Sequence, residues 1–134
     1  MFLKSKMSFL GILLAVTGHA ATVELRCPET LVTTETLEKT PPGFTSRTAE
    51  ANHYWEAVDF YSGKPEENAS LAPTGRLWQF SKKDSNYLSC RYHQSKIELF
   101  QRLSENTVSC TILLDKNVQG CFGGIPKKVI CQTE

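Results

Sequence analysis

The stretch that decides the fold spans residues 86–101 and reads "NYLSCRYHQSKIELFQ". Apolar and polar residues alternate in its first half, and successive side chains of a β-strand point to opposite faces. Cys90 and Tyr92 therefore share an apolar face, and Arg91 and His93 share the other face. The thiol points away from the imidazole, so the stretch is predicted to be part of a sheet and not a Cys–His nucleophile pair.

The same period of two recurs along most of the chain. Short segments rich in Gly, Asn, Ser and Lys separate the alternating runs and are typical of turns. We therefore predict a mainly β fold, a compact antiparallel sheet or small sandwich, in which the strands from Leu77 to Leu114 form a meander. The alternating runs are "ATVELRC" (21–27), "NHYWEAVDFYSG" (52–63), "GRLWQFS" (75–81), "YLSCRYH" (87–93), "KIELFQRL" (96–103), "NTVSCTILLD" (106–115) and "KKVICQ" (127–132).

Two segments break the alternation. In "SGKPEENASLAP" (62–73), Pro65 is followed by Glu66 and Glu67. Proline suits the first helical turn and acidic residues favour a helix N-terminus, so one short helix of one or two turns is predicted there. The segment "EKTPPGFTSRT" (38–48) is predicted to be a loop because of its prolines and glycine.

The N-terminal region has the features of a secretory signal. Lys4 and Lys6 precede a mostly apolar run, and Gly18 and Ala20 supply small residues for a peptidase. We expect residues 1–20 to be a cleaved signal peptide and residues 21–134 to form a single periplasmic domain. The apolar run is shorter than the roughly 20 residues of a transmembrane helix, so no membrane anchor is expected.

Charge argues against a nucleic-acid partner. The chain carries 15 basic and 14 acidic residues. Since Lys4 and Lys6 lie in the predicted signal, the mature domain has a charge of about −1. It has neither a basic footprint for nucleic acid nor a polybasic patch for a membrane surface.

All five cysteines follow the predicted signal. They are Cys27, Cys90, Cys110, Cys121 and Cys131. Export to an oxidising compartment favours disulfides, and the absence of a C-x-x-C motif argues against a metal site. Because five is an odd number, one cysteine has no partner within the chain. Five choices of that cysteine and three pairings of the other four leave 15 schemes open. In the predicted meander, Cys90 and Cys110 are two strand spacings apart, roughly 9–10 Å, which is too far for a bridge. Each is therefore expected to pair with Cys27, Cys121 or Cys131.

No group of residues combines a nucleophile, a base and an orienting partner, so we expect neither catalytic residues nor a cofactor. Exposed aromatic residues beside charges are instead typical of protein recognition. Trp55, Tyr61, Arg91 and His93 are predicted partner-binding residues on the faces opposite the main aliphatic stripe. For Trp55 the alternative is a place in the core.

Several motifs together resemble a family of small periplasmic proteins of proteobacteria. They are "CP" (27–28), "PPGF" (41–44), "VDFYSGKPEENASLAP" (58–73), "LWQF" (77–80) and "YLSCRY" (87–92). Some members are linked to type VI secretion regions, where small exported proteins act as immunity proteins against cell-wall effectors. The resemblance implies a periplasmic antidote to a protein toxin, for example one of L,D-transpeptidase or amidase type. It also leaves Cys121 as the unpaired cysteine, so the disulfide candidates become Cys27, Cys90, Cys110 and Cys131.

An antidote needs no chemistry of its own, because a protrusion that occludes the effector is sufficient. The acidic turn with Glu66 and Glu67 and the loop "KNVQGCFGG" (116–124) are the predicted protrusions. Two alternatives remain open: an inhibitor of lysozyme, and an enzyme that uses a reactive cysteine. The sequence leaves the partner, the oligomeric state and the bridge pattern undetermined.

Overall fold

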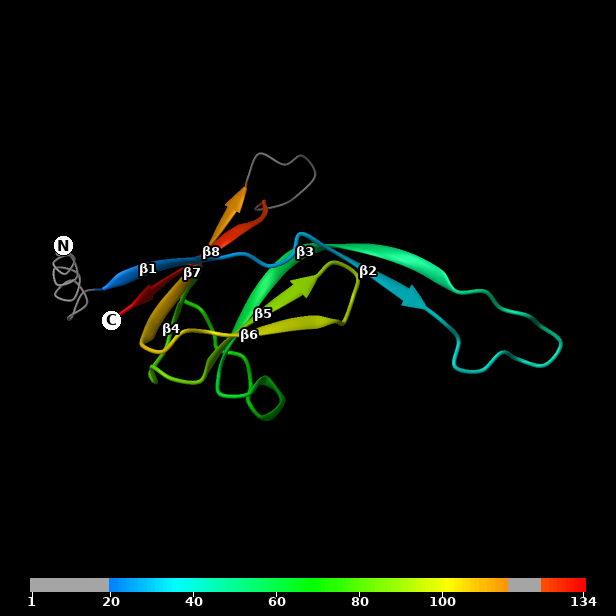
Figure 1. The fold of residues 1–134 in the computed structure, drawn as a ribbon, viewed down its shortest axis with the longest axis horizontal. Helices are drawn as coiled ribbons and strands as arrows, with labels where there is room; N and C mark the ends of the chain where they lie inside the picture. Colours follow the sequence, from blue (N-terminus) through cyan, green and yellow to red (C-terminus); the bar gives the residue numbers. More distant parts are fainter. Residues whose placement is uncertain (1–19, 116–123) are drawn as a thin grey trace, which may run out of the picture.

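The computed structural model describes residues 20–115 and 124–134, which form two antiparallel sheets of four strands each (Figure 1). The strand order is β1-β8-β7-β4 in one sheet and β2-β3-β5-β6 in the other. A single turn of 3-10 helix, η1, covers Pro65–Glu67. The strands are β1 (Ala21–Leu25), β2 (Thr30–Glu35), β3 (Ala49–Ser62), β4 (Leu77–Gln79), β5 (Asn86–Tyr92), β6 (Glu98–Arg102), β7 (Thr107–Asp115) and β8 (Ile125–Thr133).

The two sheets pack face to face around an aromatic centre. Phe60 on β3 is fully buried, and its ring centroid lies 4.9 Å from that of Trp78 and 5.8 Å from that of Phe80. Trp78 belongs to the other sheet, so this contact joins the two layers. The prediction of a mainly β sandwich with one short helix is confirmed.

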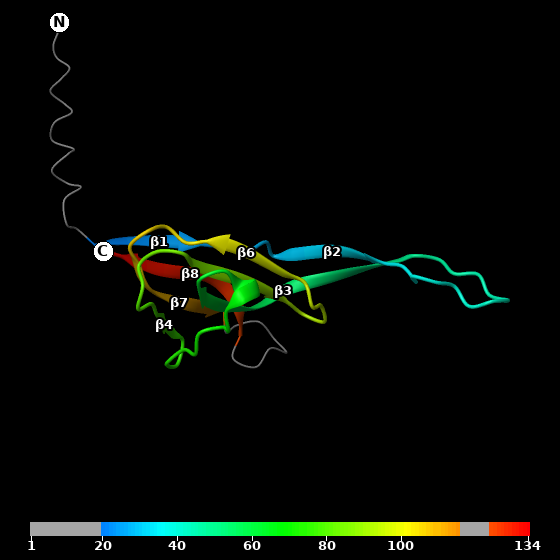
Figure 2. The same ribbon diagram turned by 90° about the horizontal axis from the view of Figure 1, so that it is seen from below.

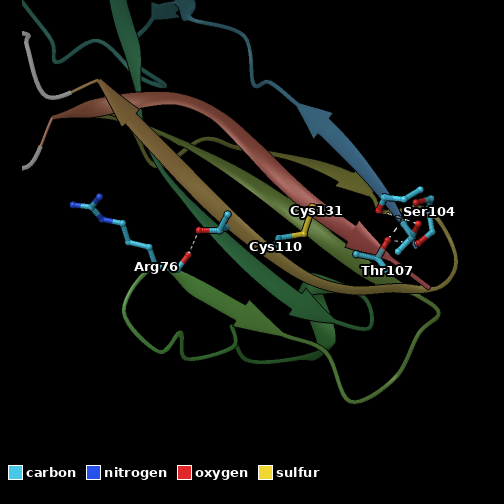
Figure 3. The surroundings of a disulfide bond; sticks show 8 residues. Arg76, Ser104, Thr107, Cys110 and Cys131 are labelled. Atoms are coloured by element: carbon cyan, nitrogen blue, oxygen red, sulfur yellow. Dashed lines mark hydrogen bonds between the residues drawn. A yellow bond between two sulfur atoms is a disulfide. The ribbon is translucent and has the colours of Figure 1, made fainter. Parts of the chain in front are cut away.

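Two disulfides reinforce this core. Cys27, in the connection from β1 to β2, is bonded to Cys90 on β5. Cys110 on β7 is bonded to its direct partner across the ladder, Cys131 on β8 (Figure 3). All four side chains are buried. The four disulfide candidates are therefore paired with one another, and Cys90 is not bonded to Cys110, as predicted. Cys121 lies outside the described residues.

The predicted meander is wrong. Cys90 does face Leu99 across the β5–β6 ladder, but β7 pairs with β8 and β4 and not with β6. The chain crosses from one sheet to the other between β6 and β7. The reason is the apolar face of β7: Cys110 and Ile112 are buried against the opposite sheet, which a continuous single sheet does not provide.

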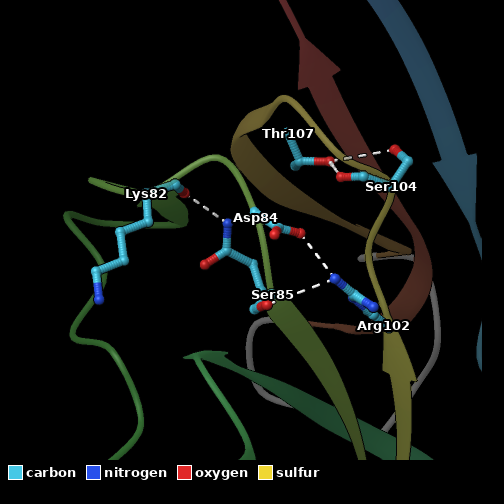
Figure 4. A network of polar contacts seen from close by, with 7 residues as sticks. Lys82, Asp84, Ser85, Arg102, Ser104 and Thr107 are labelled. Carbon is cyan, nitrogen blue, oxygen red and sulfur yellow. Dashed lines mark hydrogen bonds and ion pairs between the residues drawn. The ribbon is translucent and has the colours of Figure 1, made fainter.

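A network of polar contacts closes one end of the sandwich (Figure 4). Asn86 donates from Nδ2 to the carbonyl of Lys82 at 2.7 Å, and Arg102 reaches Asp84 at 2.7 Å. The hydroxyl of Thr107 donates to the carbonyl of Ser104 at 2.6 Å. These contacts order the β4–β5 and β6–β7 connections, where the chain changes sheets.

A β-bulge in β3 changes the face of the sheet on which the residues before it place their side chains. Trp55 pairs with Tyr92 and Ala57 with Arg91, so Glu56 is an extra residue in the ladder. Strict alternation had placed Trp55 on the face opposite Val58. The bulge returns its ring to the core, where it is 5% exposed and donates from Nε1 to the carbonyl of Ala57 at 3.0 Å. Trp55 thus takes the place in the core that the sequence had left as the alternative to partner binding.

Candidate functional site

Strands β2 and β3 extend beyond the sandwich as a long hairpin, which we call the arm and define as residues 30–54 (Figures 1 and 2). Thr30 pairs with Tyr54 at its base, and Glu35 pairs with Ala49 at the far end of the ladder. Residues 36–48 form the loop that we call the tip. The loop predicted over residues 38–48 is confirmed, whereas β2 had no counterpart among the predicted strands.

The sequence of the tip explains its shape. Phe44 donates its backbone N–H to the carbonyl of Pro41 at 3.2 Å, and Gly43 has a φ of 87°. A proline at the second position and a glycine with positive φ at the third are the preferences of a type II turn. The turn leaves the Phe44 ring 73% exposed. Across the loop, the hydroxyls of Thr40 and Ser46 lie 2.8 Å apart.

The arm concentrates exposed apolar side chains. Within the described residues, Val32, Leu37 and Phe44 are the three most exposed large hydrophobic residues, at 63%, 58% and 73%. Tyr54 at the base is 43% exposed. Val32 pairs with Asn52, and Tyr54 lies two residues further along the same strand. Val32 and Tyr54 therefore share one face of the hairpin. Monomeric proteins seldom expose large apolar side chains in such a group without a binding role.

Two histidines fix the base of the arm. The Tyr54 ring stacks on His93 with centroids 4.5 Å apart and 16° between planes, and His93 donates from Nδ1 to Glu56 at 2.7 Å. His53 donates from Nδ1 to the carbonyl of His93 at 2.9 Å. Its Nε2 lies 2.8 Å from the hydroxyl of Thr33, so the ring bridges both strands of the hairpin and the β5–β6 turn. These contacts hold the base of the arm at a set orientation to the sandwich.

The outward side of β3, β5 and β6 forms a second candidate surface, the outer face. Its side chains stand in three cross-strand rows, since directly paired residues share a face. The rows are Ala57–Arg91–Glu98, Asp59–Ser89–Phe100 and Tyr61–Tyr87–Arg102. Tyr61 and Arg91 therefore lie on one surface, as predicted, whereas His93 follows β5 and belongs to the base of the arm.

The charged groups of the outer face have polar partners within the chain. Arg91 donates to Asp59 at 2.8 Å, and this hydrogen bond, together with the Asp59 charge, raises the pKa of the Arg91 guanidinium. Ser89 donates to Glu98 at 2.7 Å. Burial, and secondly the Glu98 carboxylate, raise the pKa of Tyr61, so its hydroxyl is neutral and free to donate. This surface offers aromatic and hydrogen-bonding contacts, and a partner that covers it would bury few unpaired charges.

The outer face and the arm are continuous. A hollow of about 560 Å³ lies where β3 leaves the arm and is lined by Glu56, Arg91, Gln94 and Lys96, among others. Phe100, 48% exposed, meets the Tyr61 ring edge-on at 6.2 Å on the outer face. A single partner that touches both regions would therefore also contact these charged and polar side chains.

The two protrusions predicted from the sequence lie elsewhere than on the arm or the outer face, or outside the described residues. Glu66 and Glu67 lie in η1, between β3 and β4, and both are exposed. The loop at 116–124 lies, apart from Gly124, outside the described residues. The sequence reasoning missed the arm as a protrusion, although "PPGF" carried a usable signal: a type II turn that ends in an aromatic residue.

The described residues contain no group of three or more His, Cys, Asp or Glu arranged to hold a metal ion. Within the same residues, no helix has the length and apolar character needed to cross a bilayer. The features that stand out in the described surface are thus apolar protrusion and aromatic exposure, which suit contact with another protein.

Comparison with protein families agrees with a role in protein contact. The model of the type VI secretion system Tli immunity protein family matches residues 49–132, which is more than half of the chain. The chain belongs to the Tli immunity protein family. The resemblance to immunity proteins of type VI secretion regions is thereby confirmed. Neither the curated proteins nor the solved structures gave a match.

The Tli match includes some elements of the structure and leaves out others. It begins at Ala49, the first residue of β3, and includes both strands of the outer face's central ladder. β2 and the tip, with Val32, Leu37 and Phe44, precede the matched segment. The family model therefore describes most of the sandwich and only one strand of the arm.

Proposed function

We propose that this chain is a periplasmic immunity protein that binds a type VI secretion effector and neutralises it. Membership of the Tli immunity family is the observation that carries the proposal. The bridges Cys27–Cys90 and Cys110–Cys131 support a location in an oxidising compartment, as does the predicted signal at residues 1–20.

The neutralising action is binding without chemistry. Occlusion of an effector surface requires a rigid scaffold, exposed anchors and few buried charges at the contact. The arm and the outer face meet these requirements, and the outer-face residues Tyr61 and Arg91 remain proposed contacts. His93 at the base of the arm, and Glu66 and Glu67 in η1, are proposed to contribute at the rim.

The bonded state of the cysteines supports a binder over an enzyme. A thiolate nucleophile must be unbonded, and four of the five cysteines are in disulfides. The immunity family likewise favours an effector as partner over a lysozyme. We therefore place binding of one toxin ahead of lysozyme inhibition and of cysteine-based catalysis.

The effector class that we propose is a peptidoglycan-modifying enzyme, of L,D-transpeptidase or amidase type. The support is the resemblance of the motifs at residues 58–73 and 87–92 to small periplasmic antidotes. An antidote exported to the periplasm would meet such an enzyme where its substrate lies.

A neutralisation assay tests the function and the effector class together. Each neighbouring gene's product is expressed in the periplasm, with and without this chain, and growth is followed. Rescue of one toxin, with co-purification of a stable complex, is the expected result. Analysis of cell-wall fragments and of membrane lipids in the intoxicated cells then identifies the substrate. Lipid breakdown with an intact wall would contradict the peptidoglycan class, and absence of any rescue would contradict the immunity role.

A further inference from the structure

We propose that the arm is the element that docks into the effector, with Phe44 as its anchor. This inference rests on the proposed immunity function and adds to it the contacting element and the shape of the partner's site. The occupant is an apolar groove of the effector that receives the hairpin.

Exposure of the apolar side chains is the first argument. The three most exposed large hydrophobic residues of the described chain all lie on the arm, and Phe44 stands furthest out at 73%. Binding energy is usually concentrated in a few such anchors, with aromatic residues prominent among them. None of these three side chains belongs to the core cluster. Stability of the sandwich does not explain their apolar character.

Preorganisation is the second argument. The Pro41–Phe44 turn, the Thr40–Ser46 hydroxyl pair and the His53 bridge each restrict the arm before any partner arrives. A loop already held in its bound shape loses less conformational entropy on association. A tip that served only as a spacer would not require a proline-glycine turn to present an aromatic ring.

The shape of the arm decides what can receive it. Val32 and Tyr54 lie on one face of the hairpin, and Leu37 and Phe44 lie in the tip. A surface that contacts all four must follow one face of the hairpin and also receive its tip, as the wall and the end of a groove do. From Thr30 to Thr40 the arm has a reach of roughly 30 Å, estimated from about 3.3 Å per extended residue.

A second copy of this chain is a poor occupant. Two of the larger hollows on the described surface are lined mainly by charged and polar side chains, such as Lys82, Asp84 and Glu105 in one and Glu56 and Lys96 in the other. Neither suits the Phe44 ring. A third, smaller hollow of about 260 Å³ contains Ile125 and Pro126 but is also lined by charged residues, among them Arg26, Glu29 and Lys127. The partner is therefore expected to be a different protein with an apolar groove.

The free edge of β2 offers the groove a second mode of contact. β2 is the outermost strand of its sheet, and its sequence "TLVTTE" has no lysine or proline. Proteins normally protect such edges from pairing with other chains by these residues. An unprotected edge can accept hydrogen bonds from an extended segment of the effector's groove.

The test uses the full chain and each purified toxin that the wild-type chain neutralises. Phe44→Ala is compared with Leu77→Ala, which removes an exposed apolar side chain on β4, in the other sheet and outside both candidate surfaces. Phe100→Ala is a third variant and removes an exposed ring on the outer face. In a second variant, Asn-Gly replaces residues 36–48 and joins the paired residues Glu35 and Ala49 with a two-residue turn. We expect Phe44→Ala to weaken binding at least about 30-fold, the size of an interface hot spot. The shortened arm is expected to abolish rescue, and Leu77→Ala is expected to change the affinity less than about threefold. Phe100→Ala is expected to weaken binding less than Phe44→Ala does.

Each of the other possible outcomes contradicts one element of the proposal. Full rescue by the shortened arm, with unchanged melting temperature, would remove the arm as the docking element. A larger loss from Phe100→Ala than from Phe44→Ala would move the site to the outer face. A wild-type dimer whose arm amides are protected from hydrogen exchange would make a second copy the occupant. Failure of the wild-type chain to neutralise any toxin would instead overturn the proposed function.

Discussion

At the scale of single residues, Trp55 shows how one extra residue in a strand changes a side chain's role. Alternation along β3 assigns it to the face of Ala57 and Asp59, but the bulge at Glu56 turns it inward. A bulge adds a residue without altering the composition of the strand, so the sequence pattern does not reveal it. The consequence is a buried indole at the junction of the arm and the sandwich.

Trp55→Ala is expected to lower the free energy of unfolding by about 3–5 kcal/mol, as for other large aromatic residues removed from a core. Denaturant unfolding measures this loss. Phe100→Ala, on the exposed outer face, serves as the comparison and is expected to cost far less. Unchanged stability of Trp55→Ala combined with weaker effector binding would restore Trp55 as a contact residue.

Tyr92 gives a pH-dependent prediction. Its hydroxyl donates to the carbonyl of Pro28 at 2.7 Å, and burial raises its pKa above the ordinary value of 10.0. The folded chain keeps this proton at pH values where the unfolded chain has lost it. The resulting stabilisation is complete below pH 10.0 and is lost as the pH rises through the folded pKa.

Tyr92→Phe tests both effects of this residue. Near neutral pH it is expected to cost about 1 kcal/mol for the lost hydrogen bond. At about pH 11 the difference from wild type should shrink, because the variant has no phenolic proton to lose. Urea unfolding at both pH values measures the change. An equal difference at both pH values would show that Tyr92 does not contribute to the alkaline loss of stability.

At the scale of elements, β2 was the least visible part of the fold in the sequence. Its six residues read "TLVTTE" and carry partial burial at Leu31 and Thr33 only. Strand prediction relies on one buried face, and an arm that leaves the sandwich has little surface to bury. The tip was predictable because proline and glycine act locally, through φ and the missing N–H.

The η1 turn carries its own prediction. Glu66→Lys combined with Glu67→Lys should weaken effector binding severalfold, mainly through slower association, as is usual for charges at an interface rim. The melting temperature should stay unchanged because both side chains are exposed. The matched glutamine pair removes the charge and keeps the shape. Unaltered affinity in the lysine variant, measured by a kinetic binding assay, would remove η1 from the site.

At the scale of the whole molecule, the two disulfides connect different kinds of segment. Cys110–Cys131 links neighbouring strands within one sheet and spans 21 residues of sequence. Cys27–Cys90 spans 63 residues and fastens the β1–β2 connection, where the chain passes between sheets, to β5. The longer closed loop restricts the unfolded chain more strongly.

Replacement of each pair by alanines should reveal this difference. Chain-entropy arguments give a loss of about 4 kcal/mol for Cys27–Cys90 and about 3 kcal/mol for Cys110–Cys131. Guanidinium unfolding of the two double variants, each with the other bridge intact, measures the two values. A clearly larger loss from the Cys110–Cys131 pair would show that native packing, and not loop length, sets the contribution.

The candidate site was predictable only in part. The grouping of Tyr61 with Arg91 followed from alternation, because both lie in the regular part of a ladder beyond the bulge. The burial of Trp55 and the place of His93 in a turn depend on backbone irregularities. The arm's role as the main apolar protrusion depends on the absence of covering residues, which only three-dimensional packing determines.

The sequence by itself determined the class of fold, the short helical turn and the loop at the tip. These follow from local rules: side-chain alternation and the backbone geometry of proline and glycine. The absence of a Cys90–Cys110 bridge was predicted for a wrong reason, because β5 and β7 lie in different sheets and not on either side of β6. Only the tertiary structure decided which strands share a sheet, how the four cysteines pair and which apolar residues stay exposed. Those features depend on contacts between segments far apart in sequence, whose energies a local pattern does not record.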